Sequence, residues 1–93
     1  ESVIDVKEFL ESPKSKRLLL LKEIIDDKNK SAAISFLNEL EITLYKEFKN
    51  NVSKSVSKAL EEIIKGKKYL NSRAPSIKMI LENVALVTPD VNN

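Results

Sequence analysis

Apolar residues recur at spacings of three and four along most of this chain, which is the pattern of amphipathic helices. The first such stretch follows Ser12–Pro13, where a serine side chain accepts the amide hydrogens of a first helical turn and a proline presets the backbone. It runs through about Asp27. Leu18, Leu21 and Ile25 recur at steps of three and four and define its apolar face, with Leu20 and Ile24 beside them. The polar residues 26–30 then indicate a turn.

The longest apolar ridge defines a second helix. Its positions are Ala33, Phe36, Leu37, Leu40, Leu44 and Phe48. Ile34, Ile42 and Tyr45 lie off that ridge, so this helix is expected to contact more than one neighbour or to present an apolar surface to a partner. Asn50–Asn51 is predicted to close it.

Two more helices complete the pattern. The third is predicted to end near Ser72, and its apolar positions are Val52, Val56, Ala59, Leu60, Ile63, Ile64 and Leu70. The chain restarts at Ala74–Pro75–Ser76, and the last helix carries Ile77, Ile80, Leu81 and Val84. Thr88–Pro89 is predicted to stop it, because the residue before a proline is biased away from helical geometry.

Short connections between these four helices favour antiparallel packing of neighbours, so the sequence predicts an all-α, compact bundle. The bundle is assigned to residues 12–89, and residues 90–93 to a frayed tail. Residues 1–11 are interpreted as a lead-in or linker with room for a short fifth helix. A chain of 93 residues with one glycine and three prolines fits one small domain and argues against a turn-rich β-sandwich.

The composition removes most catalytic chemistry. The chain contains no cysteine and no histidine, so it lacks the usual zinc ligands, a thiolate nucleophile, an imidazole base and any disulfide. Gly66 is the only glycine, which excludes a glycine-rich phosphate-binding loop. Neither catalysis nor a cofactor, metal or small-molecule ligand is expected; Gly66 instead predicts a close approach of two helices.

The charge balance predicts no strong attraction to nucleic acid or to acidic lipid. Sixteen basic and fourteen acidic residues give a net charge of +2. The longest apolar run, Leu18–Leu21, is far below the roughly 18 residues that a membrane-spanning helix needs, and no secretory segment opens the chain. A cytoplasmic location is expected. Because the chain begins at Glu1 without methionine, a fragment of a longer protein is also expected.

Three charged groups could be mistaken for active sites: the carboxylates Glu61–Glu62, the acidic pair Asp26–Asp27, which is interpreted as an exposed turn, and a basic cluster. Adjacent helical residues point about 100° apart, so Glu61 and Glu62 are interpreted as solvated surface. Glu82 in the last helix is also expected to face water. The strongest nucleic-acid candidate is the basic cluster formed by Lys65, Lys67, Lys68 and Arg73. Solvated surface or a helix C-terminal charge partner explains that cluster more simply than a DNA contact does, since only one aromatic residue lies near it.

The segments Ala59–Ile64, Lys67–Leu70 and Ser76–Asn83 resemble the C-terminal end of bacterial DNA polymerase III clamp-loader subunits, which closes on a Leu-Glu-Asn-Leu type string like Leu81–Val84 here. The Ser12–Pro13 entry and the second helix also resemble that domain in the delta-prime subunits. Ala74–Pro75 stands where many relatives carry asparagine, which keeps the gamma/tau subunits as a second assignment.

The resemblance implies a non-catalytic oligomerisation domain that joins other clamp-loader subunits in a helical collar, with an AAA+ module upstream. The assembled loader, part of a DNA-directed DNA polymerase holoenzyme, places a sliding clamp on primed DNA, so this domain would contact DNA only indirectly or weakly. The candidate interface residues are Ile42, Tyr45, Met79, Leu81, Glu82, Asn83 and Val84. The alternative is a small helical nucleic-acid-binding domain that uses the basic cluster.

Overall fold

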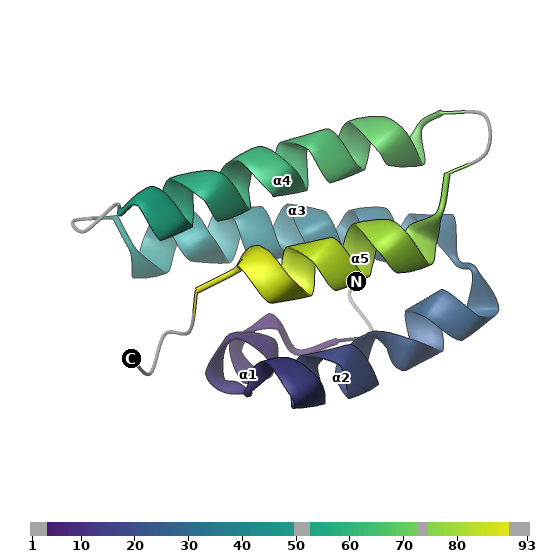
Figure 1. The fold of residues 1–93 in the computed structure, drawn as a ribbon, viewed down its shortest axis with the longest axis horizontal. Helices are drawn as coiled ribbons and strands as arrows, with labels where there is room; N and C mark the ends of the chain where they lie inside the picture. Colours follow the sequence, from purple (N-terminus) through teal and green to yellow (C-terminus); the bar gives the residue numbers. More distant parts are fainter. Residues whose placement is uncertain (1–3, 50–52, 73–74, 90–93) are drawn as a thin grey trace.

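The computed structural model describes residues 4–49, 53–72 and 75–89, and within them it contains five helices and no strand (Figure 1). The helices are α1 (Val6–Glu11), α2 (Lys14–Asp27), α3 (Lys30–Glu47), α4 (Lys54–Leu70) and α5 (Ile77–Val87). The predicted all-α bundle is therefore confirmed, and the short fifth helix is present at the N-terminal end. The predicted tail, Asn50–Asn51 and Arg73–Ala74 lie outside the described residues.

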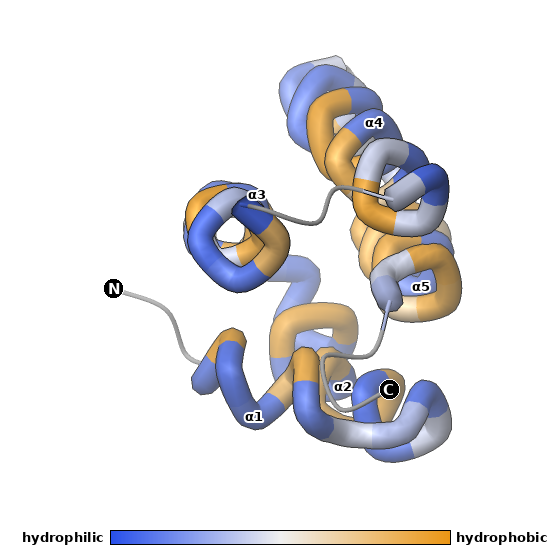
Figure 2. The backbone as a smooth tube through the Cα atoms, turned by 90° about the vertical axis from the view of Figure 1, so that its left-hand side faces the viewer, coloured by the Kyte–Doolittle hydropathy of each residue, from blue (hydrophilic) through white to orange (hydrophobic). Residues whose placement is uncertain are grey.

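The helices pack in two groups around one core. In Figure 1, α3, α4 and α5 lie along the long axis of the molecule, while α1 and α2 lie beneath them. The end-on view of Figure 2 places α3 on one side and α5 on the other, with α4 above. α4 packs against both α3 and α5, and α2 packs against α5. The faces that these helices turn inward form a single apolar cluster.

Short polar side chains fix where the helices begin. The Asp5 carboxylate accepts the first free amides of α1, and the Asn29 side chain accepts the amide of Ala32 at the start of α3. Ser53 and Ser76 cap α4 and α5 in the same way. At the other end of α2, Lys28 adopts a left-handed conformation with φ of 50°, which turns the chain toward α3.

The predicted role of Ser12 as the cap of α2 is wrong. Pro13 occupies the cap position of α2 and makes no side-chain hydrogen bond there. The Ser12 hydroxyl instead donates to the carbonyl oxygen of Glu8 at 2.6 Å, so it closes the C-terminal end of α1. The short helix before Ser12, which the apolar pattern marks only faintly, provides this alternative partner.

α1 belongs to the core of the bundle. Phe9 and Leu10 are fully buried, and the Phe9 ring meets Phe36 of α3 edge to face, with 5.0 Å between the ring centroids. The sequence-based division at residue 11, which separates a lead-in from the bundle, therefore does not follow the packing. A six-residue helix is too short to display a clear apolar repeat, although Phe9 and Leu10 are about as inaccessible as the buried positions of α3.

The apolar ridge of α3 is confirmed except at its last position, Phe48, which is half-buried and lies just beyond the end of the helix. Its five buried positions are Ala33, Phe36, Leu37, Leu40 and Leu44. The inward face of α2 is rotated from the predicted one, because Arg17, Leu21 and Ile24 are its buried residues while Leu18 and Ile25 are half-buried. No helix in the described part of the chain combines the length and apolar character needed to cross a bilayer.

Candidate functional site

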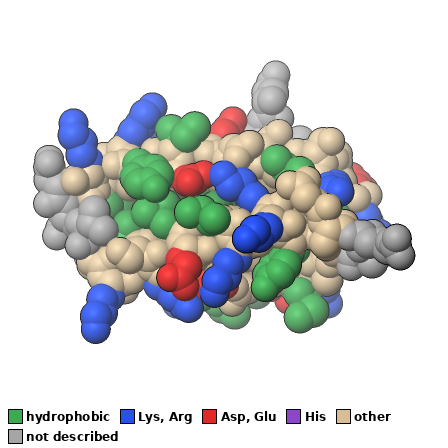
Figure 3. Space-filling view, turned by 90° about the horizontal axis from the view of Figure 1, so that it is seen from above, with side chains coloured by type: hydrophobic (Ala, Val, Ile, Leu, Met, Phe, Trp, Pro, Cys, Tyr) green, Lys and Arg blue, Asp and Glu red, His purple; other side chains and the backbone are tan. Residues whose placement is uncertain are grey.

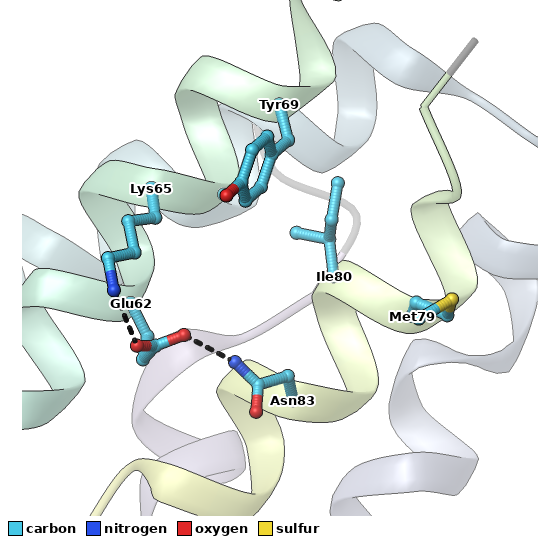
Figure 4. A pocket seen from close by; sticks show the side chains of 7 residues that line it. Glu62, Lys65, Tyr69, Met79, Ile80 and Asn83 are labelled. Carbon is cyan, nitrogen blue, oxygen red and sulfur yellow. Dashed lines mark hydrogen bonds and ion pairs between the residues drawn. The ribbon is translucent and has the colours of Figure 1, made fainter.

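A surface groove lies between α4 and α5 and encloses about 280 Å³ (Figure 4). Its lining consists of Glu62, Lys65, Gly66, Tyr69, Met79, Ile80 and Asn83. Gly66 explains why the two helices meet so closely: a Cβ atom built there would lie 2.9 Å from Cγ2 of Ile80. The predicted close approach at Gly66 is therefore confirmed, and it occurs inside the bundle.

Two large side chains flank the apolar part of this groove. Figure 4 shows Tyr69 projecting from α4 beside Ile80, and Met79 on the first turn of α5. The exposed fraction is 58% for Tyr69 and 72% for Met79. An aromatic ring and a flexible thioether that remain in water around a concave apolar surface are suited to covering another apolar side chain.

The other end of the groove is polar, and its charges are balanced. Glu62 accepts a hydrogen bond of 2.7 Å from the Asn83 side chain, across the α4–α5 boundary. Lys58 and Lys65, one turn before and after it on α4, place their Nζ atoms 3.2 and 3.6 Å from its carboxylate. The Asn83 hydrogen bond and then Lys58 hold the pKa of the Glu62 carboxyl below its ordinary value.

The interpretation of Glu62 as solvated surface is therefore wrong, whereas Glu61 is exposed as predicted. Only 15% of the Glu62 side chain remains accessible. The two residues differ because Glu62 lies one turn before Gly66, on the face of α4 that approaches α5. Glu82 is also half-buried rather than exposed.

The candidate interface residues fall on two separate surfaces and on the core. Met79 and Asn83 lie at the α4–α5 groove, while Ile42 and Tyr45, each 55% exposed, lie on α3 across the bundle (Figure 2).

The prediction that Leu81 and Val84 contribute to a partner surface is wrong. Both side chains are completely buried in this chain, because they form the inward face of α5. The resemblance made them interface candidates through the string Leu81–Val84, whereas their place in the apolar repeat of α5 makes them core residues.

Two lysines of the basic cluster already interact with other side chains of the bundle. Lys65 lies 3.6 Å from both Glu61 and Glu62, and these carboxylates raise its pKa. The Lys67 ammonium binds Glu41 and Asn38, which joins α4 to α3. Lys68 is exposed, and Arg73 lies outside the described residues.

Sequence reasoning missed the most buried cation among the residues that the structure describes. Arg17 on α2 is 1% exposed. Its guanidinium donates hydrogen bonds of 2.7–3.2 Å to the carbonyl oxygens of Phe9, Leu10, Ala85, Thr88 and Pro89. It also lies 5.0 Å from the centroid of the Phe9 ring. The available signal was its position four residues before Leu21, on the apolar face of α2.

The fold and this site define a small helical bundle with an apolar groove between α4 and α5. Over the described ranges, no group of three or more side chains is arranged to hold a metal ion. The comparisons with family models, with curated proteins and with solved structures gave no match for this chain.

Proposed function

We propose that this protein is an oligomerisation domain, and that its α4–α5 groove receives a helix from a neighbouring subunit. The observation that carries the proposal is the pair formed by Tyr69 and Met79, which stay more than half exposed on either side of an apolar groove. A partner side chain seated between them would remove their apolar surface from water at about 25 cal/mol per Å². The Glu62–Asn83 hydrogen bond lies at one end of the same groove and holds its two walls together.

The neighbouring subunit in this proposal is another subunit of a DNA polymerase III clamp loader. The support is that the segments resembling clamp-loader subunits coincide with α4 and α5, the two helices that form the groove. The domain itself would be non-catalytic and cytoplasmic. It would hold together an assembly that loads the sliding clamp on primed DNA, as a delta-prime-like subunit first and a gamma/tau-like subunit second.

Co-expression with the other loader subunits of the same genome tests this proposal. Assembly is measured by size-exclusion chromatography with light scattering. The substitution Met79→Asp places a charge on the groove and is expected to weaken assembly at least about tenfold, while stability changes by less than about 0.5 kcal/mol because Met79 is a surface residue.

The matched control is Leu19→Asp, which alters an equally exposed apolar residue on α2. This variant is expected to assemble normally. Undiminished assembly of the Met79→Asp variant, or failure of the unaltered chain to join any loader subunit, would contradict the proposal.

The salt dependence of oligonucleotide binding distinguishes the nucleic-acid alternative from the proposed oligomerisation domain. Two members of the basic cluster, Lys65 and Lys67, already bind carboxylates of this chain. We therefore expect an electrophoretic titration with a single-stranded oligonucleotide to show no tight complex at 50 mM salt. A complex that weakens by orders of magnitude at 200 mM salt, and that requires Lys68 and Arg73, would favour the alternative.

A further inference from the structure

A second groove lies between the C-terminal part of α3 and the N-terminal half of α4, and it encloses about 360 Å³. Leu44 and Val56 form its buried floor, while Phe48 and Leu60 are half-buried in its walls. Tyr45 stands over it with 55% of its surface exposed. Figure 3 looks down on α3 and α4, and hydrophobic side chains gather in its left-hand half, where α3 ends and α4 begins. The groove thus leaves a contiguous apolar surface exposed to water, which is typical of a binding surface.

The charges at the edge of this groove have one sign. Lys46 and Lys49 line it, both are exposed, and within the described residues neither ammonium has an ion-pair or hydrogen-bond partner.

The surrounding carboxylates do not neutralise these two lysines. Glu41, one turn before Tyr45, is bound by Lys67, and Glu61, beside Leu60 on α4, lies near Lys58 and Lys65. Glu47 is exposed but does not line the groove. This edge therefore differs from the polar end of the α4–α5 groove, where the charges balance within the chain.

We propose that the α3–α4 groove binds an acidic amphipathic helix of a partner protein. The apolar side of that helix would cover Tyr45, Phe48 and Leu60, and its carboxylates would meet Lys46 and Lys49. The apolar floor distinguishes this occupant from a nucleic acid, which would need further cations along its backbone. The inference is independent of the proposed clamp-loader assembly, because it concerns a different pair of helices.

A simpler role for Lys46 is to offset the negative end of the α3 dipole, since it lies in the last turn of that helix. That role requires no ligand and predicts a change in stability alone. Lys49 lies beyond the end of α3, and the apolar lining beside it has no part in such compensation. Binding measurements therefore separate the two roles.

The test uses two fluorescein-labelled helical peptides on the whole chain. Both carry leucine and phenylalanine on one face; the opposite face carries glutamate in the first peptide and lysine in the second. Fluorescence anisotropy at 50 and 150 mM NaCl is expected to show the acidic peptide binding at least about tenfold more tightly, with a difference that narrows as salt screens the charges. The double substitution Lys46→Glu/Lys49→Glu should reverse this preference, and Tyr45→Ala should weaken binding of both peptides.

The matched control is Lys14→Glu/Lys78→Glu, which makes the same change in net charge at exposed lysines away from the groove. This double variant is expected to retain the preference for the acidic peptide. Met79→Asp, which alters the α4–α5 groove, is expected to retain it as well. Circular dichroism confirms that each variant is folded. The proposal is overturned if the two peptides bind alike, if neither binds, if the control reverses the preference, or if a single-stranded oligonucleotide displaces the acidic peptide.

Discussion

Arg17 is buried between the C-terminal ends of α1 and α5, where helices leave carbonyl oxygens without intrahelical partners. Its planar guanidinium reaches carbonyls from both ends at once, and its positive charge opposes the negative ends of two helix dipoles. One side chain thereby satisfies polar groups that would otherwise be costly to bury.

The substitution Arg17→Met is expected to lower the free energy of unfolding by about 2–4 kcal/mol, because it leaves buried carbonyl oxygens without donors. Arg17→Lys should recover only part of this loss, since an ammonium group cannot reach both helix ends in the same geometry. Urea unfolding followed by circular dichroism measures both values. Lys14→Met, at an exposed position of the same helix, serves as the control and should change stability by less than about 0.5 kcal/mol.

Substitution of Gly66 by alanine would have two opposing effects on stability. Alanine in its place would favour the helix by about 1 kcal/mol, but its Cβ would lie too close to the Ile80 methyl group. Because overpacking costs about 1–3 kcal/mol, Gly66→Ala is expected to destabilise the chain by about 1 kcal/mol. In an Ile80→Ala background the same substitution should become stabilising. Thermal unfolding of the four proteins in this cycle measures the change of sign, and an unchanged sign would show that Ile80 is not the obstacle.

Glu62 makes part of the stability depend on pH. Its pKa is lowered in the folded state, so its contribution is complete above the unfolded pKa of about 4.3 and is lost as the pH falls through the folded pKa. At pH 7, Glu62→Gln should therefore be less stable than the unaltered chain by up to about 1 kcal/mol. The difference should shrink toward zero as the pH falls below the unfolded pKa and through the lowered folded pKa. Urea titrations from pH 7 to 3 give the curve, and a constant difference would contradict it.

At the scale of elements, α1 is the helix whose role the sequence understates. If residues 1–11 were a linker, Phe9→Ala would change stability little. Phe9 instead packs on Phe36 with no exposed surface, so the substitution is expected to cost about 3–5 kcal/mol. Differential scanning calorimetry measures this cost, and Lys7→Ala, at an exposed position on α1, should be nearly neutral.

The ends of the long helices follow from local chemistry and were largely predictable. α5 begins after Ser76 and ends before Thr88, as the predicted restart of the chain at residues 74–76 and the following proline indicated. The inward face of α2 was harder to predict, because four consecutive leucines leave its apolar stripe ambiguous. Packing against α1 and α5 settled the ambiguity by placing Leu21 in the core and Leu19 in water.

At the scale of the whole molecule, all five helices contribute to one core cluster, although α1 lies outside the domain limits that the sequence suggested. We therefore expect a single cooperative unfolding transition with an enthalpy of about 65 kcal/mol near 60 °C. Calorimetric and van't Hoff enthalpies should agree. An early transition that leaves the signal of α3–α5 intact would show that α1 and α2 unfold separately.

The candidate surfaces could be predicted from the sequence only in part. Tyr45 is an exposed apolar residue, as its position off the main ridge suggested, and Met79, which the resemblance pointed to, is exposed as well. Nothing in the order of residues indicated that Tyr45 would share a groove with Lys46 and Leu60, or Met79 with Glu62 and Gly66. Such grouping depends on the rotation and crossing of helices, which side-chain packing determines.

The sequence by itself determined the helices, because periodicity, caps and prolines act within a few residues of one another. It also determined the absence of thiol and imidazole chemistry, which composition alone decides. The tertiary structure decided which apolar residues fill the core, where Arg17 finds its carbonyl partners and which side chains form the two grooves. These features join residues distant in the chain, and the mutual packing of the helices brings them together.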